Sequence, residues 1–217
     1  MLPLLALTAA WWLTGFPGAM MPGPISTMAL VEGSRQGVRA GPLLTLGHGL
    51  AELLMVAALY LGLSEALQRP LVAGLIGVVG GLVLLWMGAD IARAAWTGRV
   101  RLGAGQPVGL ARLGLVPAGL LTTLSNPYWL LWWATIGAAT LLKFLPFGQA
   151  GLVAYYVGHV STDLIWNSFL AALVSSGRRR VPQRVYRGVL VACGVFLVAL
   201  SVWFVWSGVG FLRVAQS

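Results

Sequence analysis

The sequence predicts an all-α integral membrane protein with six transmembrane helices, arranged as two inverted three-helix repeats in which helices one and four are broken. Three observations predict this fold class: an apolar composition, six long apolar stretches, and a polar motif that occurs once in each half of the chain. Of the 217 residues, 59% are hydrophobic and 9% are charged, and the mean hydropathy is +0.87. A soluble protein of this composition would lack the polar side chains needed to cover its surface.

Charge pattern and cysteine content exclude two other classes. The formal net charge is +9, but the basic residues lie in short clusters between apolar stretches, which is typical of membrane loops and excludes a nucleic-acid partner. The single cysteine, Cys193, excludes a disulfide framework. No charged leader precedes the apolar residues 1–10, so we expect them to begin helix one. Residues 1–217 are expected to form a single transmembrane domain.

Six stretches are long enough to span a bilayer, which takes about 20 apolar residues in a helix. They cover residues 5–30, 40–63, 70–92, 112–141, 148–174 and 188–211. Pro22-Gly23-Pro24 interrupts the first and Asn126-Pro127 the fourth, where missing backbone donors and steric clash are expected to bend or unwind the helix. Unpaired backbone groups at such breaks can hold the carboxylate or ammonium of a zwitterion. These five residues are therefore our candidates for substrate binding, although an ordinary proline kink explains Asn126-Pro127 equally well.

Basic residues in alternate loops predict the orientation. Eleven of them follow the first, third and fifth stretches, against three on the other side: Arg69, Lys143 and Arg213. The positive-inside rule then places both termini outside. Residues 1–98 would form the first three-helix repeat, 99–111 a cytoplasmic linker, and 112–217 the second repeat.

Each half of the chain carries a histidine with an acidic residue four positions later. His48 with Glu52 aligns with His159 and Asp163 at an offset of 111 residues, and a glycine precedes each histidine. Two further correspondences follow in order: Pro24 with Pro127 at an offset of 103, and Gly81 with Gly194 at 113. Such internal similarity indicates a duplicated three-helix unit, and an inverted repeat would bring the two polar pairs together near the bilayer midplane.

Three roles are open to these four ionisable residues. Residues i and i+4 share a helix face, so each histidine lies beside its acid. Ionisable groups inside a membrane are costly and usually face a bundle interior or a water-filled cavity. The pairs can carry a proton, because a histidine titrates near neutral pH. They can bind Zn²⁺, Mn²⁺ or Fe²⁺ as two imidazoles and two carboxylates, or they can only hold two helices together.

Several tryptophans lie in the halves of the helices that we expect to face the outside. They are Trp11, Trp12, Trp129, Trp132, Trp133, Trp203 and Trp206. Tryptophan is enriched at both membrane–water interfaces, so we expect some of these side chains to form an interfacial belt. Trp132 and Trp133 can alternatively gate a pathway or stack on a substrate.

With these motifs, the chain resembles the lysine-exporter (LysE/RhtB-type) family of small bacterial transporters. The matching residues are Met20-Met21-Pro22-Gly23-Pro24, the turn region 33–41, Gly47-His48 with Glu52, Asn126-Pro127-Tyr128-Trp129, and Gly158-His159 with Asp163. The resemblance covers essentially the whole chain. It implies proton-driven export of amino acids or related small metabolites across the bacterial inner membrane.

The sequence thus predicts a proton-coupled exporter, with a divalent metal-ion exporter as the alternative. In the first, the two helix breaks bind substrate while His48, Glu52, His159 and Asp163 carry the proton; in the second, the same four residues bind the metal. We expect no enzyme, since the chain shows no nucleophile–base–orienter arrangement and no cofactor fingerprint. The expected partners are the substrate and the lipid bilayer, with a homodimer as an option, and no cofactor is expected except a metal under the alternative.

Overall fold

The computed structural model describes residues 2–21, 23–63, 66, 69–101, 104–105, 109–177 and 182–215. Within them the chain is helical apart from turns and one short antiparallel strand pair, β1 (Val100–Arg101) with β2 (Ala104–Gly105). The α-helices are α1 (Leu2–Met20), α2 (Pro24–Gln36), α3 (Ala40–Tyr60), α5 (Pro70–Trp96), α6 (Leu115–Leu124), α7 (Pro127–Trp132), α8 (Ala138–Phe144), α9 (Gly148–Gly177) and α10 (Gln183–Val214). The predicted all-α class is confirmed.

The described residues also contain three shorter helical segments. They are the 3₁₀ turns η1 (Gly109–Leu113) and η3 (Leu145–Phe147) and the π-helical η2 (Trp133–Gly137). Five runs within the described residues are long and apolar enough to cross a membrane: Leu2–Met20, Ala40–Tyr60, Pro70–Trp96, Pro127–Gly177 and Gln183–Val214. The fourth run contains a reversal of direction at η3, where Gly148 has a φ of +59° that favours glycine.

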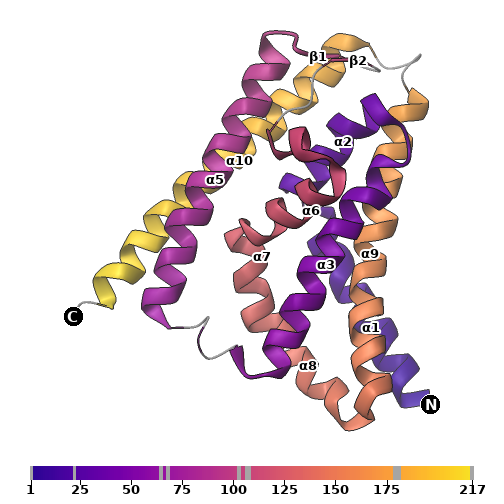
Figure 1. Cartoon of the computed structure of the whole chain (residues 1–217), viewed down its shortest axis with the longest axis vertical. Helices are drawn as coiled ribbons and strands as arrows, with labels where there is room; N and C mark the ends of the chain where they lie inside the picture. Colours follow the sequence, from indigo (N-terminus) through magenta and orange to yellow (C-terminus); the bar gives the residue numbers. More distant parts are fainter. Residues whose placement is uncertain are drawn as a thin grey trace.

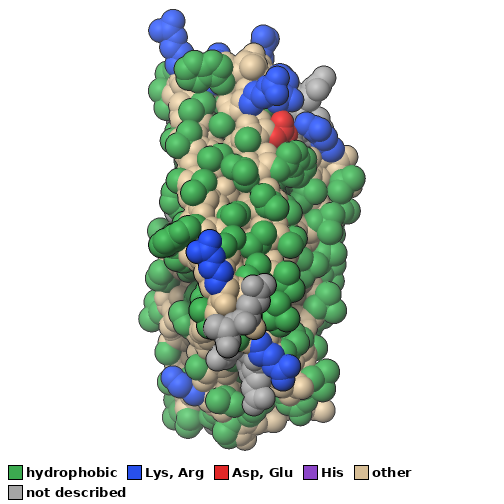
Figure 2. Space-filling view, turned by 90° about the vertical axis from the view of Figure 1, so that its left-hand side faces the viewer, with side chains coloured by type: hydrophobic (Ala, Val, Ile, Leu, Met, Phe, Trp, Pro, Cys, Tyr) green, Lys and Arg blue, Asp and Glu red, His purple; other side chains and the backbone are tan. Residues whose placement is uncertain are grey.

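Figure 1 shows how these helices are arranged. Both termini lie at one end of the molecule, and β1 and β2 lie at the other. The helices α5 and α10 form a pair at one side, while α1, α2, α3 and α6 to α9 form a second group. Figure 2 shows one face covered largely by hydrophobic side chains, with more of the visible Lys and Arg near the end that holds β1 and β2. An apolar flank with charged ends is the surface expected of a chain that crosses a bilayer.

Glycines bring α5 and α10 into close contact. A Cβ atom on Gly77 would lie 2.9 Å from the Cα of Gly208, and one on Gly88 would lie 2.8 Å from the backbone oxygen of Gly194. Small residues at such positions let helix backbones approach closely, which is how helices associate in membranes. Close packing rather than chemistry therefore explains these glycines.

The loop between α5 and α6 is tied to the end of α5 by one carboxylate. Asp90 pairs with Arg99 at 3.0 Å and with Arg112 at 3.2 Å, and it accepts a hydrogen bond from the backbone N–H of Gly109 at 2.9 Å. Arg112 lies in η1, directly before α6. The start of α6 is thereby held against the end of α5.

Both predicted breaks coincide with helix ends. The helix α1 stops at Met20, Gly23 is extended, and Pro24 begins α2. In the second half, α6 stops at Leu124 and α7 begins at Pro127. Proline has no backbone N–H and fits the first turn of a helix, so each proline begins a new helix after the interruption.

A glycine contact between α3 and α6 positions the first histidine. A Cβ atom on Gly47 would lie 2.0 Å from the backbone oxygen of Val116, and one on Gly119 would lie 2.1 Å from that of Leu44. The two backbones are therefore in direct contact one residue before His48. This contact fixes the position of the His48 backbone relative to α6.

Candidate functional site

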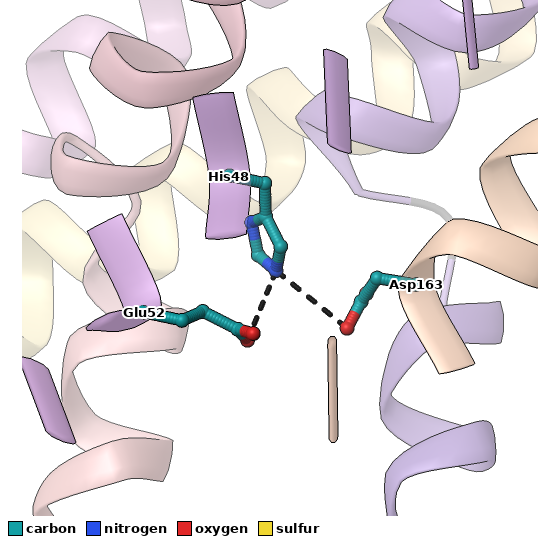
Figure 3. Close-up of side chains that lie close together, drawn as sticks. All are labelled: His48, Glu52 and Asp163. Carbon is teal, nitrogen blue, oxygen red and sulfur yellow. Dashed lines mark ion pairs between the residues drawn. The ribbon is translucent and has the colours of Figure 1, made fainter. Parts of the chain in front are cut away.

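The two predicted His–acid pairs meet between α3 and α9. Glu52 Oε1 lies 3.1 Å from His48 Nε2 and 2.8 Å from His159 Nδ1. Asp163 Oδ2 lies 3.6 Å from His48 Nε2 and 3.5 Å from His159 Nδ1. Figure 3 shows His48 and Glu52 on one helix and Asp163 on another, with their polar atoms pointing toward one another. Each carboxylate thus contacts both imidazoles, and we call these four residues the His–acid ring.

The polar atoms of the His–acid ring are buried, and several have no hydrogen bond of good geometry. Within the described residues these are His48 Nε2, both carboxylate oxygens of Glu52, His159 Nδ1 and Asp163 Oδ2. Buried polar atoms normally find a partner, because leaving one unsatisfied is costly. Five such atoms that converge on one place indicate a site whose bonding is completed by a proton or a bound ligand.

Thr123 of α6 sets the proton position on His48. Its hydroxyl donates to the backbone oxygen of Gly119 at 2.7 Å, and it lies 2.7 Å from His48 Nδ1. A hydroxyl has one proton, and Thr123 directs it toward Gly119, so we assign the hydrogen of the second contact to His48 Nδ1, with Thr123 as the acceptor. His48 Nε2, which faces the two carboxylates, is then a bare acceptor unless it takes up a second proton.

Aromatic rings surround His159. The ring centroids of Trp132, Trp133 and Trp11 lie 4.9, 5.0 and 5.2 Å from that of His159. Trp11 is 2% exposed and Trp133 is fully buried. These two side chains therefore pack in the interior and do not belong to the expected interfacial belt. Trp203 and Trp206 are 53% and 74% exposed, as a lipid-facing or interfacial position requires.

The π-helical segment η2 carries one of these rings, that of Trp133. It begins at Trp133, and the hydroxyl of Tyr155 donates to the backbone oxygen of Gly137, its last residue, at 2.6 Å. Trp11 donates from Nε1 to the backbone oxygen of Tyr155 at 2.8 Å. Such π-bulges inside α-helices occur frequently at functional sites. Nothing in the spacing of apolar residues signalled it.

One cavity of about 90 Å³ connects the His–acid ring with both helix breaks. Its lining includes Gly23, Pro24 and Asn126 from the breaks, and His48, His159 and Asp163 from the ring. Glu52 is fully buried and lies outside this lining. The structure thus brings together two sets of candidates that are far apart in sequence.

The remaining candidates for substrate binding take other positions. Pro22 lies outside the described residues. Pro127 is buried and packs on α5, where a Cβ atom on Gly80 would lie 2.9 Å from its Cδ. Asn126 lines the cavity, but its side-chain oxygen accepts from the backbone N–H of Tyr128 at 3.1 Å and so caps α7. Pro127 therefore contributes to helix packing, and Asn126 caps the start of α7.

The cavity lining offers both hydrogen-bond donors and acceptors. The first N–H groups of α2, those of Ile25 and Ser26, precede the first intrahelical bond and have no partner within the helix. The buried Trp129 Nε1 and the Asn167 side-chain oxygen have no hydrogen bond within the described residues. Both residues line the cavity with Asp163. Trp129 and Asn167 are not among the predicted site residues, which come from the two helix breaks and the repeated His–acid pairs.

Comparisons with known proteins agree with this arrangement. The LysE type translocator family model matches residues 16–208. The chain is 28% identical over 200 residues to the "Chemotactic transduction protein ChpE" of Pseudomonas aeruginosa, covering 91% of this chain and 97% of the relative. It is 26% identical over 189 residues to the "Putative amino acid efflux protein YcgF" of Bacillus subtilis, covering 86% and 89%. No solved structure matches the chain.

Proposed function

We infer that this chain, which belongs to the LysE type translocator family, is a proton-coupled secondary transporter that exports amino acids or related small metabolites. The family is one of membrane transporters, and the long apolar helices suit a multi-pass membrane protein. One relative is named for amino acid efflux. The membrane we propose is the bacterial inner membrane, and the function is transport rather than catalysis.

We propose that the helices form six transmembrane passes in two inverted repeats, 1–98 and 112–217, joined by a cytoplasmic linker at 99–111. Both termini would lie outside. The arrangement in Figure 1 supports this, since the termini lie at one end and the turns after α2 and α5 lie at the other. Those turns hold more basic residues, as cytoplasmic loops do.

Contacts related by an exchange of halves support the inverted repeat. A Cβ atom on Gly81 would lie 3.2 Å from the backbone oxygen of Ser201, and one on Gly88 would lie 2.8 Å from that of Gly194. The offset of 113 residues that relates Gly81 to Gly194 also relates Gly88 to Ser201. The same exchange within the His–acid ring converts the contact of His48 with Asp163 into that of His159 with Glu52.

The observation that carries the proposed function is the single cavity shared by the helix breaks and the His–acid ring. A zwitterion fits its donors and acceptors. The substrate carboxylate would face the first N–H groups of α2 and Trp129 Nε1, where the helix dipole favours an anion. The ammonium would face Asp163 and the Asn167 oxygen. Secondary transporters commonly bind substrate at such broken helices.

The His–acid ring would carry the coupling proton. Because Thr123 holds a hydrogen on His48 Nδ1, a second proton on Nε2 would lie between two carboxylates. Loss of that proton would leave acceptor atoms facing one another. The proton therefore stabilises the contact between α3 and α9, and its release would weaken that contact. Since Asp163 also lines the cavity, substrate and proton would influence the same side chain.

Purified protein in proteoliposomes tests this function. With an imposed pH gradient, we expect amino acids to be transported and Zn²⁺, Mn²⁺ and Fe²⁺ not to be. Each compound is assayed in the same preparation, with liposomes lacking protein as the background. Amino acid transport that does not respond to the pH gradient would refute the coupling, and transport of metal alone would refute the substrate.

A divalent cation remains the second candidate substrate because of one observation. A nitrogen of His48 and one carboxylate oxygen each from Glu52 and Asp163 lie within 4.8 Å of one another, in a set of residues that can bind Zn²⁺ or Mn²⁺. Elemental analysis of purified protein distinguishes the candidates. We expect no stoichiometric metal; a stoichiometric metal that is lost in the double variant His48→Ala, His159→Ala would establish the cation instead.

A further inference from the structure

We propose that the cavity selects neutral amino acids with an apolar side chain, an inference that rests on the proposed function and specifies its substrate. Beyond the groups assigned to the substrate's carboxylate and ammonium, the cavity lining is mainly apolar and aromatic. The groups that would face the rest of the substrate are the side chains of Met21, Ile25, Tyr128 and Trp132, together with the ring carbons of Trp129. Pockets of this kind gain affinity by removing apolar surface from water.

A basic side chain would find no second carboxylate in this cavity. Asp163 is the one acidic residue in the described lining, and it would already pair with the α-ammonium of the substrate. Glu52 is fully buried behind the cavity, in contact with His48 and His159. A second positive charge would therefore lie among aromatic rings. Attraction to a ring face is weaker than the cost of burying an unpaired cation.

An acidic side chain would also lack a partner. The described lining contains no lysine or arginine. Its cationic groups could only be His48 and His159, and both already face the carboxylates of Glu52 and Asp163. A further negative charge would compete with those contacts. Both charged classes are thus disfavoured by the same set of residues.

Tyr128 is the position at which this selectivity can be reversed. Its side chain lines the cavity and is half-buried, while its backbone N–H is held by Asn126. A carboxylate is tolerated in the first turn of a helix, so Tyr128→Glu is expected to fold. The new carboxylate would lie on the apolar wall and could pair with the ammonium of a lysine side chain.

Competition in proteoliposomes tests the selectivity. With radiolabelled leucine as the transported probe, unlabelled leucine and phenylalanine are expected to compete at least about tenfold better than lysine or glutamate, a difference of about 1.4 kcal/mol. Tyr128→Glu should raise the competition by lysine relative to leucine at least about tenfold. Tyr128→Gln introduces a side chain of nearly the same size as glutamate without its charge. It should weaken competition by leucine without strengthening competition by lysine. Tyr60→Glu makes the same change at a residue that is 59% exposed at the end of α3, and it should compete as the wild type does.

The outcomes separate this inference from the proposed function. Lysine or glutamate that competes as well as leucine in the wild type would overturn the selectivity while leaving amino acid export intact. The wild-type ranking decides this even if Tyr128→Glu does not fold. Absence of transport for every amino acid would overturn the proposed function itself.

Discussion

Replacing Glu52 with glutamine is expected to slow export driven by a pH gradient sharply and to leave the protein folded. Glu52 Oε1 lies 3.1 Å from His48 Nε2 and 2.8 Å from His159 Nδ1, so it is the carboxylate oxygen nearest to both imidazoles. An amide of nearly the same size has neither the negative charge nor the ability to take up the proton. We expect the initial rate in proteoliposomes to fall roughly 5- to 150-fold, which corresponds to the coupling free energy that typically links two sites.

Two comparisons make this prediction specific to coupling. Exchange of labelled for unlabelled substrate without a gradient should persist in Glu52→Gln, because Glu52 does not line the cavity. Asp163→Asn should instead slow both exchange and gradient-driven transport, because Asp163 lines the cavity and would face the substrate ammonium. The thermal unfolding temperature in detergent checks that both variants fold. A wild-type rate of gradient-driven transport in Glu52→Gln would remove Glu52 from the proposed proton pathway.

The location of the site could be predicted from sequence because its chemistry is rare in this chain. Two histidines with an acid four residues later stand out among long apolar stretches. Helix periodicity places each acid on the face of its own histidine. It cannot tell which acid also reaches the histidine of the other helix, because that depends on how α3 and α9 pack. Glu52 proved to be the closer bridge.

The helix breaks were also predictable, since proline removes a donor whatever its surroundings. The tertiary contacts at each break were not predictable in this way. Pro127 packs against Gly80 of α5, and Asn126 caps α7, both through contacts that depend on the tertiary fold. Burial of Trp11 was missed for the same reason. Its place in the interior comes from its stack on Tyr155, with centroids 4.9 Å apart, and from its hydrogen bond to that residue's backbone.

A methyl group added at Gly119 is expected to disturb both the fold and the site. In Gly119→Ala the new Cβ would lie 2.1 Å from the backbone oxygen of Leu44 and 3.2 Å from the backbone nitrogen of His48. A backbone oxygen cannot rotate away as a side chain can, so α3 and α6 must separate. The bond between His48 and Thr123, now 2.7 Å, would lengthen or break. Overpacking of this kind costs about 1–3 kcal/mol.

Thermal unfolding in detergent and transport in proteoliposomes measure the two effects together. A loss of this size should lower the unfolding temperature by about 2–4 °C for each kcal/mol in a chain of this length. The matched change Gly188→Ala adds the same methyl group on α10, where no described atom beyond the adjacent backbone of its own helix lies within 4 Å. It should neither destabilise the protein nor slow transport. A Gly119→Ala protein that unfolds and transports as the wild type does would mean that α3 and α6 are not in backbone contact. It would also remove the contact by which we explain the position of His48 beside Thr123.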